Sequence, residues 1–166
     1  MYNEFIEIKD YSTDLHECIE QTVAHLTSNK TDFNYPGMLL GKIQSGKTRT
    51  FIGIIALAFD RGYDTCVIFT KGTKALAEQT LKRLDSEFFQ FIENHEVKVY
   101  DIMSLPAMTP YIKQQKLTFI VKKETNNLNH LVNLFVDNPD LSQKKVLFID
   151  DEADFASVGF KRDRIA

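Results

Sequence analysis

Apolar residues near the start of the chain recur with the spacing of one helical face. Four of them are separated by four, four and three positions, with polar residues between them: Leu15, Ile19, Val23 and Leu26. This spacing predicts an amphipathic helix, and the preceding Ser-Thr-Asp run at 12–14 offers side chains for its N-cap. The polar stretch 27–36, which contains a proline, predicts a loop.

After residue 36, short apolar runs alternate with longer helical patterns. Five runs predict strands, the first of them leading into a glycine-bearing turn: residues 38–43, 65–70, 97–102, 117–121 and 146–150. Three segments between these runs predict helices: residues 48–61, 73–93 and 126–137. Strands that are apolar throughout and separated by helices are typical of parallel sheets buried on both faces. The pattern predicts an α/β fold, with an open, mostly parallel sheet, helices on both faces and a preceding N-terminal helix. Its ligand site is expected at the carboxyl ends of the strands.

One glycine-bearing turn has the sequence of a phosphate-binding loop. Residues 41–48 read GKIQSGKT and match G-x-x-x-x-G-K-[ST] without a mismatch, between a predicted strand and a predicted helix. The glycines let successive N–H groups surround an anion, and the start of the helix adds its positive dipole end. Lys47 is placed to neutralise the β and γ phosphates of a nucleoside triphosphate, and the Thr48 hydroxyl to hold Mg²⁺. The residues expected to bind the nucleotide are Gly41, Gln44, Ser45, Gly46, Lys47 and Thr48.

Acidic residues follow the last predicted strand, where a phosphate loop needs a second element. One carboxylate can reach Mg²⁺ through water, and the next can orient or deprotonate the attacking water. Because successive strand residues face opposite sides of a sheet, only one of Asp150 and Asp151 can share the metal side with the loop. We assign Asp151 to the metal and Glu152 to the water, with Asp150 closing the strand. The expected catalytic residues are therefore Lys47, Asp151 and Glu152, and the expected metal ligands are Thr48 and Asp151. An acidic helix N-cap after a core strand is the plainer alternative.

These two motifs resemble those of a known superfamily. Residues 151–154 read DEAD, and with GKIQSGKT they resemble motifs I and II of superfamily-two helicases and translocases of the DEAD/DEAH type. The longer strings LLGKIQSGKT and LFIDDEADFAS resemble bacterial restriction- and defence-associated ATPases. Segment 69–80 resembles helicase motif Ia, and the whole similarity covers about residues 37–157.

The resemblance implies that the chain is the N-terminal RecA-like motor domain of such an enzyme. The resemblance implies a P-loop NTPase domain over 35–166 that binds ATP and Mg²⁺. The helical pattern that precedes it predicts an N-terminal helical extension over residues 1–34. The resemblance also implies a nucleic-acid strand, DNA rather than RNA, held by four residues: Lys71, Gly72, Thr73 and Gln79. An ordinary strand–helix turn is the alternative for that segment.

The same resemblance implies partners outside this sequence. In these proteins a coupling motif and a second RecA-like domain with an arginine finger follow, and a nuclease domain is present in some of them. The sequence ends twelve residues after Asp154. We therefore expect a fragment that binds ATP but hydrolyses it slowly, since losing an arginine finger costs about 10³–10⁵ in rate.

Composition and charge narrow the class of protein further. With 43% hydrophobic and 26% charged residues, the chain is typical of soluble globular proteins. No apolar run approaches the roughly 18 residues of a membrane span, and the N-terminus has no apolar signal core, which favours the cytoplasm. Cys18 and Cys66 lack metal-type spacing and are expected to be free thiols. The net charge of −3 argues against binding nucleic acid by bulk charge alone.

Two other functions remain open. Another P-loop phosphotransferase is one, although a kinase would usually have an arginine-bearing lid and the sequence has no arginine between residues 122 and 146. A non-catalytic nucleotide-binding or scaffold module is the other, although a degenerate site would tend to lack Glu152. No adenine-reading motif is evident, with Tyr35 the nearest aromatic candidate.

Overall fold

The computed structural model describes residues 1–29, 31, 35–37, 47–71 and 73–151, with the backbone alone for residues 47 and 48. The chain divides into two compact units, residues 1–64 and 65–166. This division by contacts differs from the predicted domain boundary at residues 34/35, which stays a prediction.

The described part of the first unit consists of three helices: α1 Tyr2–Ile8, α2 Thr13–Ser28 and α3 Lys47–Asp60. The predicted N-terminal helix is confirmed as α2, and its cap is the Ser12 hydroxyl, which accepts a bond from the Leu15 amide at 3.4 Å. The helix predicted over 48–61 is confirmed as α3. After it the chain turns at Gly62, whose φ of 89° is a backbone conformation that glycine adopts without strain.

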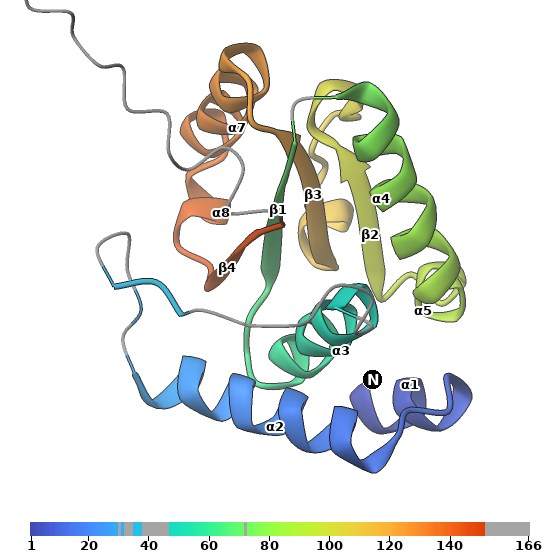
Figure 1. The fold of residues 1–166 in the computed structure, drawn as a ribbon. Coiled ribbons are helices and arrows are strands. Elements are labelled where there is room, and N and C mark those ends of the chain that lie inside the picture. Colours follow the sequence, from blue (N-terminus) through green and yellow to red (C-terminus); the bar gives the residue numbers. More distant parts are fainter. Residues whose placement is uncertain (30, 32–34, 38–46, 72, 152–166) are drawn as a thin grey trace, which may run out of the picture. The chain divides into compact units, whose positions relative to one another are not determined.

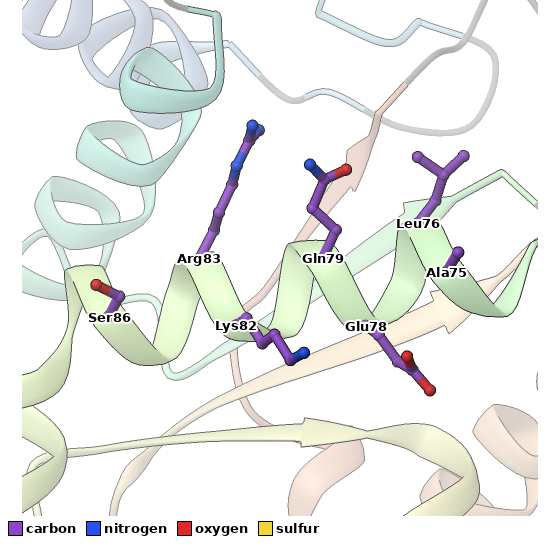
Figure 2. A pocket seen from close by; sticks show the side chains of 7 residues that line it. All are labelled: Ala75, Leu76, Glu78, Gln79, Lys82, Arg83 and Ser86. Atoms are coloured by element: carbon purple, nitrogen blue, oxygen red, sulfur yellow. The ribbon is translucent and has the colours of Figure 1, made fainter.

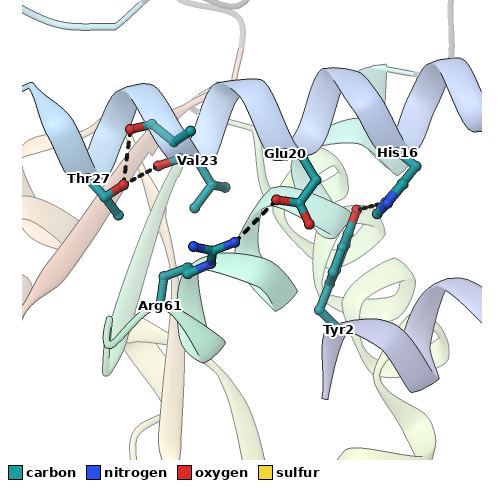
Figure 3. A network of polar contacts seen from close by, with 7 residues as sticks. Tyr2, His16, Glu20, Val23, Thr27 and Arg61 are labelled. Atoms are coloured by element: carbon teal, nitrogen blue, oxygen red, sulfur yellow. Dashed lines mark hydrogen bonds and ion pairs between the residues drawn. The ribbon is translucent and has the colours of Figure 1, made fainter.

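Small and polar groups fix the packing of the first unit. Helices α2 and α3 approach closely at Gly53, where an added methyl group would overlap the Ile19 side chain. Figure 3 shows polar contacts within this unit. The Tyr2 hydroxyl lies 2.8 Å from His16 Nδ1, and Arg61 pairs with Glu20 at 3.3 Å.

The second unit is built on a sheet whose four described strands are β1 Thr65–Thr70, β2 Val97–Asp101, β3 Lys116–Lys122 and β4 Val146–Asp150. All pairs are parallel, in the order β2-β3-β1-β4. The predicted strands at 65–70, 97–102, 117–121 and 146–150 are thus confirmed to within about a residue at each end, as is the α/β fold class. The strand predicted at 38–43 lies outside the described residues.

The helices of this unit are α4 Lys74–Glu87, α5 Phe89–Glu93, the 3₁₀ turn η1 Ile102–Ser104, α6 Pro110–Lys113, α7 Thr125–Asp137 and α8 Pro139–Ser142. The prediction of one continuous helix over 73–93 was wrong, because the segment forms two helices, α4 and α5. The helix divides at Phe88, whose fully buried side chain turns into the core while its backbone leaves helical geometry (ψ 13°). Helix α7 confirms the segment predicted over 126–137.

The strand order determines which face each long helix covers. From β1 to β2 the chain moves two positions one way across the sheet, and from β3 to β4 it moves two positions the other way. Right-handed crossovers therefore place α4 and α7 on opposite faces, as Figure 1 shows. The α7 face holds a cluster of buried apolar residues that includes Val67, Phe119 and Leu131.

The two cysteines are free thiols, as predicted. Cys18 is half-buried in α2, whereas Cys66 is fully buried in β1, and this burial raises the pKa of its thiol. Among the described residues, no helix is both long and apolar enough to cross a membrane.

Candidate nucleotide site at the strand ends

The carboxyl ends of β1, β3 and β4 meet at one edge of the sheet. Two backbone hydrogen bonds continue the strand pairing beyond these ends. The Lys123 amide donates to the Thr70 carbonyl and the Asp151 amide to the Phe69 carbonyl, both at 3.0 Å. Strand β1 lies between the other two. Residues that follow β3 and β4 are thus brought together around the end of β1.

The sheet separates the two adjacent aspartates. Asp150 is opposite Phe69, whose ring packs on the apolar cluster of the α7 face. Since side chains alternate along a strand, Asp150 belongs to the α7 face. The same alternation, continued by one residue past β4, directs Asp151 to the α4 face. This geometry agrees with the sequence argument that the two acids have different roles.

Asp150 has a specific partner on its own face. Lys123, which follows β3, forms an ion pair with the Asp150 carboxylate. The two side chains are 14% and 37% exposed, so the lysine is largely buried and the aspartate is partly open to solvent. The pair connects the segments on either side of β1.

The turn between β3 and α7 is held by a second polar group. Asn127 is fully buried; its Oδ1 accepts a bond from the Lys122 amide at 3.1 Å, and its Nδ2 donates to Glu124 at 2.7 Å. The Lys122 ammonium lies 2.6 Å from the same carboxylate. Sequence reasoning missed Asn127, and the only available signal was an amide side chain at the start of a helix that directly follows a strand.

The β1–α4 turn carries the residues expected to contact nucleic acid. Lys71 is half-buried, and its carbonyl accepts a 2.7 Å bond from the Thr73 amide. Thr73 is the N-cap of α4 and Gln79 lies further along this helix; both side chains are exposed. Gly72 lies outside the described residues. Gln79 also lines an open pocket along α4 (Figure 2), with Ala75, Leu76, Glu78, Lys82, Arg83 and Ser86.

The other candidate residues are only partly described. Gly41, Gln44, Ser45, Gly46 and Glu152 lie outside the described residues. Lys47 and Thr48 are the first two residues of α3, so a helix begins where the phosphate-loop pattern requires one. Because Lys47 and Asp151 belong to different units, their predicted meeting around one ligand stays a prediction.

The donor chemistry at this edge fits a hydrated Mg²⁺. The half-buried Asp151 offers carboxylate oxygens at the end of an apolar strand. Beside it on the same face, Thr70 is 2% exposed and its hydroxyl has no hydrogen-bond partner within the described chain. Mg²⁺ prefers oxygen ligands, keeps several waters and needs only one or two carboxylates. No group of three or more metal-type ligands occurs among the described residues.

A parallel α/β sheet with an acidic strand end, and a GKT sequence at the start of a helix, is the arrangement of a P-loop NTPase. A family model described as the type III restriction enzyme, res subunit, matches residues 8–156, and the chain therefore belongs to this family. Its domain is a helicase-like ATPase motor domain of superfamily two, which confirms the resemblance drawn from the motifs. Comparison with curated proteins and with solved structures gave no match.

Proposed function

We propose that this chain binds Mg–ATP through loop 41–48 together with Asp151 and Glu152, and that it is the ATP-hydrolysing half of a DNA-directed motor. The observation that carries the proposal is the position of Asp151. It lies half-buried at the tip of β4, and alternation along the strand gives it the face opposite Asp150. On that face the Thr70 hydroxyl has no hydrogen-bond partner among the described residues. A carboxylate in that place is what a phosphate loop needs for its metal.

Each residue has a separate task in this proposal. The Lys47 ammonium holds the β and γ phosphates, and the Thr48 hydroxyl and Asp151 hold Mg²⁺, Asp151 through a water. Glu152 accepts the proton of the attacking water or orients it. Bound Mg²⁺ would neutralise charge that develops on the phosphates. Lys71, Gly72, Thr73 and Gln79 contact the DNA backbone, which the exposure of Thr73 and Gln79 supports.

The proposal also includes the DNA and the further domains with which this chain would act in the full enzyme. A family of restriction enzymes supports DNA as the track and a multi-domain context. We propose a second RecA-like domain that supplies an arginine finger, a nuclease domain elsewhere in the enzyme, and action in the cytoplasm. The isolated chain then hydrolyses ATP slowly.

Binding of a fluorescent ATP analogue, with and without Mg²⁺, tests the site. Lys47→Ala is expected to weaken binding about 10- to 100-fold, because it removes a charge-assisted contact to phosphate. Asp151→Asn is expected to remove most of the gain in affinity that Mg²⁺ gives. Lys98→Ala and Asp137→Asn, which lie outside the proposed site, serve as charge-matched controls and should bind normally. Unchanged affinity in Lys47→Ala would show that the phosphate-loop assignment is wrong.

Hydrolysis separates an enzyme from a scaffold. Glu152→Gln is expected to keep Mg–ATP binding and to lower the single-turnover rate about 10²- to 10⁴-fold, since it removes the general base. If the wild type binds ATP but Glu152→Gln hydrolyses it equally fast, Glu152 does not have the proposed role.

A further inference from the structure

Two adjacent carboxylates lie at the tip of β4, where the proposed metal would bind. Asp150 and Asp151 differ by one position, so both lie near the proposed Mg²⁺ site, and alternation along the strand gives them different faces. Asp150 is the last residue of the ladder, opposite Phe69, so pairing fixes its backbone. The orientation of its carboxylate depends on the partner of its side chain.

Lys123 is this partner of the Asp150 side chain. It follows β3 and reaches Asp150 across the end of β1, and its own amide donates to the Thr70 carbonyl at 3.0 Å. Lys122, the adjacent lysine, is already paired with Glu124 at 2.6 Å in the β3–α7 turn. Lys122 and Lys123 therefore form these ion pairs with different carboxylates.

The surroundings strengthen the Lys123–Asp150 pair. Phe69 and Phe148 lie on the same face as Asp150 and stack with their ring centroids 6.1 Å apart and an interplanar angle of 7°. The lysine side chain is 14% exposed. An ion pair next to aromatic rings and partly removed from water is screened less than one on an open surface.

We propose that Lys123 is a positioning residue: it holds Asp150 on the α7 face and so leaves Asp151 as the carboxylate that β4 gives to the metal. This inference rests on the proposed Mg–ATP site. It also connects the β3–α7 turn, through one side chain, to the strand that precedes Asp151.

Removing Lys123 takes away the cation paired with Asp150, so the negative charge of Asp150 adds to that of Asp151 in attracting the metal. Mg²⁺ is then bound more tightly, but it is shared between a position at Asp150 and a position at Asp151. Removing the charge of Asp150 has the opposite effect, because it leaves an ammonium near the metal. The two changes made together should compensate each other.

The test measures, on this chain, the Mg²⁺ concentration that gives half-maximal binding of a fluorescent ATP analogue. Lys123→Ala is expected to lower this concentration about threefold, Asp150→Asn to raise it about threefold, and the double variant to restore the wild-type value. Lys123→Arg should resemble the wild type, because it keeps the charge. In single-turnover hydrolysis, Lys123→Ala should lower the rate at saturating ATP about tenfold without weakening ATP binding, and Asp150→Asn should relieve that loss.

Lys113 and Asp140 provide a matched control, since they form a 3.0 Å ion pair with a lysine that is 19% exposed. Lys113→Ala and Asp140→Asn should leave the Mg²⁺ midpoint unchanged. Should Lys123→Ala fail to fold, Asp150→Asn and Lys123→Arg still test the sign of the shift. An unshifted midpoint, or an equal shift in the control pair, overturns the inference alone. Loss of Mg²⁺-dependent binding in the wild type overturns the proposed function together with it.

Discussion

At the scale of single residues, Tyr2 makes the first unit sensitive to alkaline pH. Its buried hydroxyl contacts His16 Nδ1 at 2.8 Å, and burial, with smaller contributions from Glu20 and Tyr11, raises its pKa to about 12. The phenol therefore stays protonated in the folded chain at a pH where the unfolded chain, with a pKa near 10, is ionised. The stability from this group is complete below about pH 10 and is lost as the pH rises towards 12.

Tyr2→Phe tests this linkage. The variant loses one hydrogen bond and should be less stable by about 1 kcal/mol at pH 8. It should then lose less stability than the wild type between pH 10 and 11.5, as measured by urea unfolding. Two parallel curves of stability against pH would contradict the assignment.

Residue identity predicted part of the candidate site, and pairing in space supplied the rest. Asp151 could be distinguished from Asp150 because alternation along a strand is a local property. The partner of Asp150 could not be predicted, since Lys123 reaches it only because β1 lies between β3 and β4. That strand order depends on packing of the whole sheet.

At the scale of elements, α7 has a buried row and an exposed row. Leu131 and Leu134 are buried in the cluster on the sheet, whereas Leu128, Val132 and Val136 are 41%, 58% and 68% exposed. Leu131→Ala is expected to lower the free energy of unfolding by about 2–4 kcal/mol, because it leaves a cavity. Chemical denaturation measures this value directly.

Val132→Ala is the matched control on the same helix. It should change stability by no more than about 0.5 kcal/mol, since its side chain is exposed and alanine favours the helix. Similar losses at the two positions would mean that the wrong face of α7 packs on the sheet.

The elements that could be predicted are those with a repeated pattern. Strand β1 was predicted to the residue because its run TCVIFT is apolar or β-branched throughout. Helix α1 was missed: it has seven residues, and only Tyr2 and Phe5 are buried, which is too little periodicity to recognise. The break at Phe88 was missed because burial of its ring, rather than a glycine or proline, ends α4.

At the scale of the whole molecule, the proposed function requires that one ligand act on both units. Loop 41–48 belongs to the first unit and Asp151 to the second. A ligand that binds only the folded arrangement stabilises it by about 2.7 kcal/mol at a hundredfold excess over its dissociation constant. If a single Mg–triphosphate contacts Lys47 and Asp151, this stabilisation must reach both α3 and β4.

Amide hydrogen exchange with a slowly hydrolysed ATP analogue tests that requirement. With Mg²⁺, exchange should slow both in the first turns of α3 and at the Asp151 amide, which donates to the Phe69 carbonyl. With the analogue and a chelator, the α3 region should remain protected, because loop 41–48 binds the phosphates without the metal. The end of β4 should lose most of its added protection, because Asp151 contacts the ligand through the metal. Asp151→Asn with Mg²⁺ should reproduce the chelator result, and Asp137→Asn should behave as the wild type. If protection in the wild type with Mg²⁺ is confined to α3, Asp151 does not share the ligand with Lys47. Mg–ATP binding could not then link the phosphate loop to the end of β4, as the proposed motor requires.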